Sequence, residues 1–452
     1  MRITPLEDWV KQKIRGKDTG RGDGQTRLSR EEIKKYQLAK LKETFSWARS
    51  RSAFYRKHLQ DVEIQSLNDL GRVPFTTAGD LRRQGARFVC VSQSEISRVV
   101  TLQSSGTSGE PKRIFFTGGE QELIIDFFAH GMSTLVGAGD RVLILLPGRS
   151  PGSVGDLLSA ALQRLGAASI THGPVLDAPA TLRLIFEQKV TAIVGAPTQV
   201  LALARCCGDS NFSDQRPPAR NVLLTTDHVP DAIKETLRNT WGCRVFNHYG
   251  MTEMGLGGGV ECEAVAGYHL READLYFEII NPVTGAPAPE GEAGEVVFTT
   301  LTRRGMPLIR YRTGDLARFI PEPCPCGTVL ARMTPVRERL QGRIMLGHGE
   351  YLSMADLDEA LFALPGLLDF RAVIGPGNLL QLEIKTNRMV SPPDALKAAR
   401  RVVEYSGVVR RVRRKKIEFN LNVLEWQGDY LTGTAKRTII DKREPALSQS
   451  GV

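Results

Sequence analysis

The chain has 452 residues, 41% of them hydrophobic and 24% charged, a composition typical of a globular protein rather than a disordered one. That length exceeds what one core comfortably supports, so we expect two or more domains. No apolar run approaches the roughly 20 residues that span a bilayer, and the N-terminus lacks the layout of a secretory signal. We therefore expect a cytoplasmic location and no membrane partner.

The formal net charge of +10 suits an anionic ligand such as a nucleotide or coenzyme A. The same charge could reflect nucleic-acid binding, but the basic residues are mostly dispersed, and we expect no nucleic-acid partner. The one dense basic run, at 410–416, has the pattern of a solvated face. The seven cysteines are irregularly spaced, which favours metal ligation or simple burial over disulfides.

Apolar residues at helical spacing predict a long amphipathic helix over residues 30–58. Short apolar runs then alternate with helical stretches. Buried strands are predicted at 142–146, 192–195 and 221–224, and helices between them at 157–165 and 230–241. Strands that alternate with helices indicate an α/β fold with parallel strands.

After residue 270 the sequence pattern predicts mainly strands, and this pattern changes again near residues 341–343. Strands are predicted at 276–280, 295–299, 370–374 and 380–384, and helices at 354–362 and 393–405. We therefore expect an N-terminal α/β domain with a β-rich subdomain over residues 1–342. A small α+β domain follows over residues 343–452.

The stretch SSGTSGEPKR at 104–113 has the composition of a phosphate-binding loop. Its hydroxyls and glycines are those of Ser104, Ser105, Gly106, Thr107, Ser108 and Gly109. Glycines let the backbone approach a phosphate closely, and Lys112 supplies a positive charge. The stretch is not a Walker-type loop, whose lysine opens a helix, because residues 113–117 predict a strand. The alternative is an ordinary hairpin turn.

Four stretches in order carry a family resemblance: SSGTSGEPKR, HYGMTE at 248–253, PLIRYRTGDLARF at 307–319, and QGR at 341–343. This succession resembles the adenylate-forming acyl-CoA synthetase superfamily. The sequence RYRTGD and the spacing after YGMTE are most similar to those of its phenylacetate–CoA ligase branch. The resemblance implies ATP-dependent, AMP-forming activation of a carboxylic acid, aryl or short-chain, followed by transfer to coenzyme A. It also implies that the small C-terminal domain is mobile.

The resemblance further implies roles for single residues in adenylation. Charge that develops on the leaving phosphates must be met by preorganised donors, the role implied for the loop and for Lys112. Glu253 would hold Mg²⁺, which prefers a hard carboxylate, with Thr252 beside it. His248 and Tyr249 would flank the adenine. The other implied nucleotide contacts are Gly250, Asp227, Arg343 at the hinge, and Asp315, whose two carboxylate oxygens would accept both ribose hydroxyls.

The acyl pocket and the C-terminal tail complete the expected site. The pocket is expected at Pro147 and Gly148 and at Ala196 and Pro197. In the family, a tail lysine in a Gly-Lys-x-x-Arg setting contacts the carboxylate and the α-phosphate. The tail here reads GTAKR at 433–437, so a threonine stands in the lysine position and Lys436 follows two residues later. We expect Lys436 to serve instead, through a local shift; the alternative is that this chain adenylates poorly.

A second constellation has the chemistry of a metal site. Cys262, His269, Cys324 and Cys326 offer three thiolates and one imidazole, a set that suits tetrahedral Zn²⁺. Some phenylacetate–CoA-ligase-like proteins carry a similar set here. With four protein ligands the site would be structural. The alternative is two unrelated pairs that pack locally.

Three functions stay open at this point. The first is the AMP-forming ligase that uses ATP, Mg²⁺ and coenzyme A. The second keeps adenylation but transfers to another acceptor, such as an amine or a carrier protein. The third is a nucleotide-binding partner protein on a degenerate ligase scaffold. A homodimer is also left open.

Overall fold

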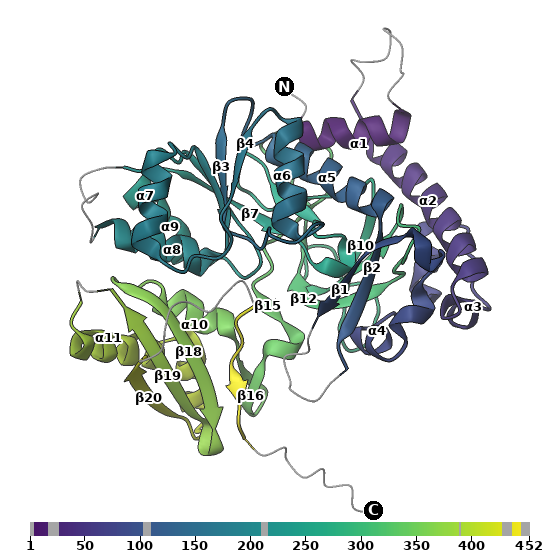
Figure 1. Ribbon diagram of the computed structural model, residues 1–452. Coiled ribbons are helices and arrows are strands. Elements are labelled where there is room, and N and C mark those ends of the chain that lie inside the picture. The colour runs from purple at the N-terminus through teal and green to yellow at the C-terminus, as the bar shows by residue number, and fades with distance from the viewer. Residues whose placement is uncertain are drawn as a thin grey trace, which may run out of the picture. The chain divides into compact units, whose positions relative to one another are not determined.

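The computed structural model describes residues 4–16, 27–102, 110–208, 216–387, 390–426 and 436–443. The chain divides into two compact units (Figure 1). Unit 1 comprises Met1–Gly173 and Phe246–Val336, and unit 2 comprises Pro174–Val245 and Arg337–Val452. This division differs from the expected boundary between residues 342 and 343, which stays a prediction. No helix in the described ranges is long and apolar enough to cross a membrane.

The helices of unit 1 begin with α1 (Pro5–Arg15) and α2 (Arg30–Arg51). Ser29 caps α2 through a capping box with Glu32. The single helix expected over 30–58 is interrupted, because the backbone becomes extended at Ser52, whose hydroxyl donates to the carbonyl of Arg87. The remaining helices are α3 (Tyr55–His58), α4 (Ala78–Gln84), α5 (Gly118–Met132) and α6 (Val154–Arg164).

The strands of unit 1 form four groups. The antiparallel hairpin is β1 (Ile96–Leu102) and β2 (Lys112–Thr117). The parallel pair is β3 (Arg141–Ile144) and β4 (Ala168–Thr171), joined through α6. The first antiparallel sheet is β10 (Leu275–Ile280), β11 (Gly294–Thr300) and β12 (Tyr311–Ala317). The second is β7 (Arg244–Tyr249), β8 (Gly259–Glu261), β9 (Tyr268–Leu270), β14 (Arg332–Met333) and β13 (Phe319–Ile320).

Unit 2 joins an α/β segment to a small α+β sheet. The first segment holds α7 (Ala178–Glu187), β5 (Ala192–Gly195), α8 (Pro197–Gly208), β6 (Asn221–Leu224) and α9 (Asp231–Trp241). The sheet has the order β20–β19–β18–β21. Its strands are β18 (Leu367–Gly375), β19 (Leu379–Thr386), β20 (Asn420–Glu425) and β21 (Ile440–Asp441). Unit 2 also holds β15 (Glu338–Arg339) and the hairpin of β16 (Ile344–Gly347) and β17 (Glu350–Leu352). Its other α-helices in the described residues are α10 (Met354–Leu361), α11 (Pro392–Glu404) and α12 (Gly407–Arg414).

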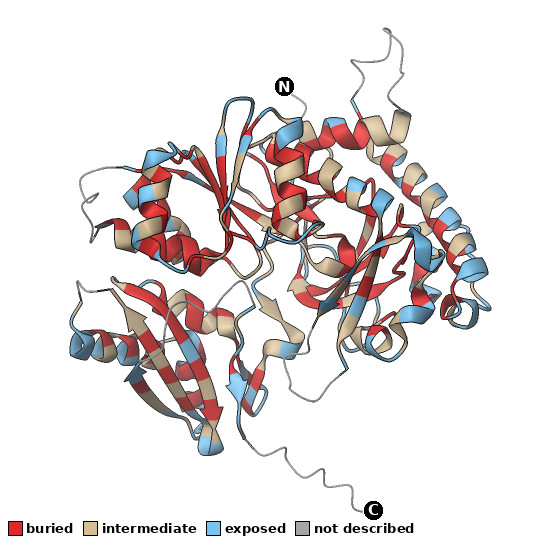
Figure 2. Ribbon diagram, in the orientation of Figure 1, coloured by how far each residue is buried: buried red, intermediate tan, exposed pale blue. Residues whose placement is uncertain are grey.

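Buried residues concentrate in the strands of both units, while many helices expose one face (Figure 2). All four residues of β5 and of β6 are buried, and these two strands are parallel. Continuous apolar runs of this kind are what covered parallel strands require. The expected α/β fold class is confirmed.

Candidate active site

Two residues from different motifs form an ion pair in unit 1. Lys112 is the first residue of β2, and Glu253 lies in the short 3-10 helix η4 (Thr252–Met254) that follows β7. The Lys112 ammonium donates to Oε1 of Glu253. The Glu253 side chain is 3% exposed and that of Lys112 is 17% exposed. The structure thus brings together the cation expected for phosphate and the carboxylate expected for magnesium.

A tyrosine that we did not predict joins this pair. The hydroxyl of Tyr311, the first residue of β12, donates to Oε1 of Glu253 at 3.1 Å. The Lys112 ammonium lies 3.5 Å from the same hydroxyl oxygen. A signal was present, since Tyr311 stands inside the RYRTGD motif. Three motifs far apart in the sequence therefore converge on one carboxylate oxygen.

Two expected nucleotide contacts also meet in unit 1. The hydroxyl of Tyr249, at the end of β7, donates to Oδ2 of Asp315 on β12 at 2.9 Å. Asp315 is fully buried, and its backbone N–H donates to the hydroxyl of Thr313. The Tyr249 ring stacks on Tyr268 with centroids 5.8 Å apart. A carboxylate and an aromatic ring that were both expected to contact the nucleotide thus lie side by side.

His248 packs among aromatic rings beside this pair. Its ring centroid lies 6.4 Å from that of Phe127 and 6.2 Å from that of Phe128. Burial, together with the charge of Arg271, lowers the pKa of His248 to about 4. The imidazole is therefore neutral at pH 7, which suits contact with an uncharged base.

Gly250 has a packing role that the sequence did not reveal. A Cβ at this position would lie 2.1 Å from the carbonyl oxygen of Leu256 and 2.9 Å from the His248 ring. No side chain fits there, so glycine is required for the turn that leads from β7 to Glu253. Whether Gly250 also contacts a nucleotide stays a prediction.

The four expected metal ligands form one cluster in unit 1. The ligand atoms of Cys262, His269, Cys324 and Cys326 all lie within 4.8 Å of one another. The Sγ atoms of Cys262 and Cys324 are 3.7 Å apart. Nε2 of His269 lies 3.3 Å from Sγ of Cys324. Two sulfur ligands about 2.3 Å from a tetrahedral ion would be about 3.8 Å apart, so the cluster fits zinc.

The environment of these ligands is consistent with a closed structural site. Cys262, His269 and Cys324 are buried. Burial raises the pKa of the Cys326 thiol to about 12 and lowers that of His269 to about 4. Three other buried cysteines, Cys90, Cys207 and Cys243, lie outside the cluster.

Asp227 and two acyl-pocket residues lie together in unit 2. A small pocket is lined by residues that include Ala196, Pro197, Asp227 and Arg437. Oδ2 of Asp227 accepts the backbone N–H of Arg437 at 3.2 Å. Asp227, which was expected to contact the nucleotide, thus forms a hydrogen bond with the tail segment within unit 2.

The tail is held at Arg437 by a buried group of charges in unit 2. The guanidinium pairs with Asp358 on α10, lies 3.4 Å from Asp369, and donates to the carbonyl of Phe370. Burial raises the pKa of Asp358 to about 6, although Arg437 opposes the shift. Lys436, the preceding residue, is exposed.

The expected roles of the remaining site residues stay predictions. Arg343 pairs with Glu338, and both side chains are 32% exposed. Pro147 and Gly148 lie in unit 1, whereas Ala196 and Pro197 lie in unit 2. The loop residues Ser104, Ser105, Gly106, Thr107, Ser108 and Gly109 lie outside the described residues.

Solved structures of CoA ligases share the fold of this chain. A solved 2-hydroxyisobutyryl-CoA ligase, in the postadenylation state with 2-HIB-AMP, superposes with a TM-score of 0.76. It is 21% identical and covers 92% of this chain and 90% of its own. A solved anthranilate CoA ligase in complex with anthranoyl-AMP superposes with a TM-score of 0.54 at 16% identity, covering 74% of this chain and 64% of its own. The architecture is that of adenylate-forming CoA ligases.

Sequence comparison then identifies the family. The profile described as AMP-binding enzyme matches residues 60–301, more than half of the chain, and the chain belongs to this family. The phenylacetate-coenzyme A ligase of Thermus thermophilus is 29% identical over 383 residues, or 81% of this chain and 83% of that protein. The phenylacetate-coenzyme A ligase of Escherichia coli is 29% identical over 325 residues, or 69% and 71%. The resemblance to the phenylacetate–CoA ligase branch is confirmed.

Proposed function

We propose that this chain is an AMP-forming carboxylate–CoA ligase. In the first step a carboxylate oxygen attacks the α-phosphorus of ATP, and the bond to the bridging oxygen of pyrophosphate breaks. In the second step the sulfur of coenzyme A attacks the acyl carbon of the adenylate and expels AMP, while the thiol proton is lost. The observation that carries the proposal is the convergence of Lys112, Glu253 and Tyr311 in a member of the AMP-binding family.

The charges of the Lys112–Glu253 pair match those of a metal–phosphate complex. Glu253 offers a buried carboxylate to Mg²⁺, which would neutralise phosphate charge. Lys112 would then turn from the carboxylate to the oxygens of the leaving pyrophosphate. Tyr311, through its hydrogen bond to Oε1, holds the carboxylate in orientation. Preorganised charges of this kind typically supply a large part of the rate enhancement.

The Tyr249–Asp315 pair supports a site for the nucleoside. Asp315 would accept the ribose hydroxyls, and Tyr249 fixes its carboxylate through the 2.9 Å hydrogen bond. The neutral ring of His248 lies next in the chain and would flank the adenine. The loop at 104–109, Thr252, Asp227 and Arg343 are assigned to the phosphates and ribose by resemblance.

The acid is proposed to be aryl or short-chain. The phenylacetate-coenzyme A ligases among the relatives favour an aryl acid. Pro147, Gly148, Ala196 and Pro197 are proposed to line its pocket. Lys436 is proposed as the cation that meets the carboxylate during adenylation.

The cysteine–histidine cluster is proposed to hold one structural Zn²⁺. The support is the mutual closeness of four ligand atoms and their burial. Such an ion would join the β8–β9 hairpin to the segment around Cys324, and it would take no part in the chemistry.

The test of adenylation is ATP–pyrophosphate exchange across a panel of aryl and short-chain acids. Acid-dependent exchange supports the proposal, and its absence with every acid would favour the degenerate-scaffold alternative. Turnover that proceeds with an amine or a carrier protein, but not with coenzyme A, would favour the second alternative. Each of the three functions therefore predicts a different result.

A further inference from the structure

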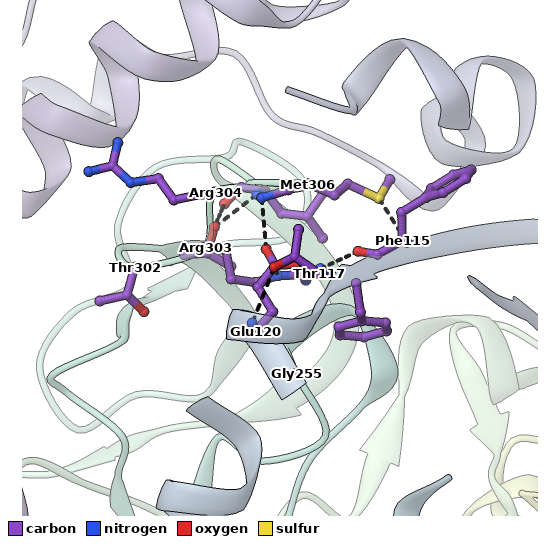
Figure 3. A network of polar contacts seen from close by, with 12 residues as sticks. Phe115, Thr117, Glu120, Gly255, Thr302, Arg303, Arg304 and Met306 are labelled. Carbon is purple, nitrogen blue, oxygen red and sulfur yellow. Dashed lines mark hydrogen bonds and ion pairs between the residues drawn. The ribbon is translucent and has the colours of Figure 1, made fainter. Parts of the chain in front are cut away.

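Glu120 and Arg303 form a buried ion pair (Figure 3). The pair lies beside the proposed active site, although neither residue was expected to bind a substrate or a metal ion. Glu120 is in the first turn of α5, and Arg303 lies between β11 and β12. Nε of Arg303 donates to Oε1 of Glu120 at 3.2 Å, and the side chains are 6% and 4% exposed. A pair this well buried costs solvation on both sides, which raises the question of what it does.

The carboxylate of Glu120 also accepts hydrogen bonds from two backbone N–H groups. Its Oε2 accepts the N–H of Thr117 at 2.8 Å, where β2 ends and α5 begins. Its Oε1 also accepts the N–H of Gly305 at 3.0 Å. Glu120 thereby ties the end of β2 to the segment that carries Arg303.

Arg303 uses its two other nitrogens on the two segments that carry the proposed site. Its Nη1 donates to the carbonyl oxygen of Glu253 at 2.8 Å. Its Nη2 donates to the carbonyl oxygen of Phe115 on β2 at 3.0 Å. The guanidinium also lies over the ring of Phe116, 4.8 Å from its centroid. One rigid planar group thus spans η4 and β2.

We propose that Arg303, held by Glu120, is a positioning residue that fixes Lys112 relative to Glu253. Phe115 is three residues from Lys112 on the same strand, about 10 Å along it, so the position of its carbonyl sets that of Lys112. The carbonyl of Glu253 in turn sets the origin of the Glu253 side chain. The inference rests on the proposed function, because it assumes that these two charges act on the phosphates.

The geometry requires a guanidinium rather than a positive charge alone. Three donors point at three acceptors from one plane, and an ammonium on a flexible stem cannot reproduce that arrangement. Arg303→Lys keeps the charge beside Glu120 and so avoids leaving a buried carboxylate unpaired. This variant therefore separates positioning from charge compensation.

The experiment compares Arg303→Lys with Arg30→Lys. Arg30 also pairs with a buried glutamate, Glu272, at 2.6 and 2.8 Å, and touches neither β2 nor η4 by any hydrogen bond described in the structure. We expect Arg303→Lys to lower kcat of acid-dependent pyrophosphate exchange by about 10- to 100-fold, the scale of an ångström-sized misplacement. The KM for the acid should change by less than about twofold, because these groups act on phosphate. Arg30→Lys should leave both constants near wild type.

A second measurement does not depend on turnover. Hydrogen–deuterium exchange should become faster in 112–117 and 252–254 of Arg303→Lys, and not in Arg30→Lys. Glu120→Gln, which removes the charge that holds Arg303, should show the same pattern in weaker form. Thermal unfolding of each variant establishes that it is folded.

The outcomes separate this inference from the proposed function. Wild-type protein without exchange on any acid would contradict the proposed function, while the deuterium measurement would still decide the positioning role. Active wild type with an Arg303→Lys variant of normal kcat would overturn the inference. Unchanged deuterium exchange in both segments would also overturn it.

Discussion

Lys112 and Glu253 form an ion pair although 141 positions separate them in the sequence. The hydroxyl of Tyr311 donates to the same carboxylate oxygen at 3.1 Å. Because β2, η4 and β12 each supply one member, this contact requires the tertiary structure that brings the three segments together. The proposed chemistry and the tertiary structure therefore depend on the same contact.

We expect Lys112→Ala and Glu253→Gln each to cut acid-dependent pyrophosphate release by about two orders of magnitude or more. Each change removes a charge partner that would act on the phosphates. The measurement is initial-rate pyrophosphate release at saturating acid and ATP. Lys40→Ala, which removes a surface ion pair with Glu43, is the control and should retain activity. Near-normal rates in both site variants would exclude the proposed mechanism.

Tyr311→Phe tests the third member of the cluster. It removes the hydroxyl that orients Oε1 of Glu253 but keeps the buried ring. We expect a smaller loss than for Glu253→Gln, about tenfold, together with a higher Mg²⁺ concentration for half-maximal activity. Titration of Mg²⁺ at fixed ATP measures this shift. An unchanged Mg²⁺ requirement would show that the hydroxyl does not orient the carboxylate.

The zinc proposal predicts about one zinc per chain in protein purified without chelator. Cys324→Ser should lose the metal and lower the midpoint of thermal unfolding by several degrees, since metal binding is coupled to folding. Cys243→Ser is the matched control, because Cys243 is also buried but lies outside the cluster. Elemental analysis that finds no metal in the wild type would count decisively against the site.

The tail prediction concerns Lys436. Lys436→Ala should impair adenylation by about tenfold or more, while thioester formation from preformed acyl-AMP stays largely intact. Lys442→Ala, another exposed tail lysine, should leave both steps unchanged. A normal adenylation rate in Lys436→Ala would refute this assignment.

The pKa of His248 predicts a pH dependence of stability. Burial lowers its folded pKa to about 4 from 6.5, so the unfolded chain binds a proton in this window that the folded chain does not. Stability from this group is present above pH 6.5 and is lost as the pH falls toward 4, by at most about 1.4 kcal/mol per unit. His248→Gln should therefore flatten the pH dependence of urea unfolding. Parallel profiles for the two proteins would contradict this account.

Sequence reasoning succeeded where a signal was local. The strand at 113–117, the buried runs of β5 and β6, and the cysteine–histidine ligand set were all predicted, since alternation, apolar runs and ligand chemistry are visible in short windows. The break of the first long helix was missed, because Ser52 bonds to Arg87, 35 residues away. Helical periodicity alone carries no information about such a partner.

The supporting residues of the site show the same limit. Glu120 had a visible signature, since Thr117 and Glu120 form a capping box. Arg303 had none, because two of its partners are backbone carbonyls, which every residue carries. Its position beside β2 and η4 follows only from the folded chain.

The central claim is that one chain both adenylates a carboxylic acid and transfers the acyl group to coenzyme A. The most direct measurement is product stoichiometry in a single reaction with ATP, Mg²⁺, coenzyme A and the acid that is most active in exchange. The account predicts acyl-CoA, AMP and pyrophosphate in equal amounts, with none of the acyl-CoA formed when ATP is omitted. Formation of ADP instead of AMP, or release of AMP with no acyl-CoA, would contradict it.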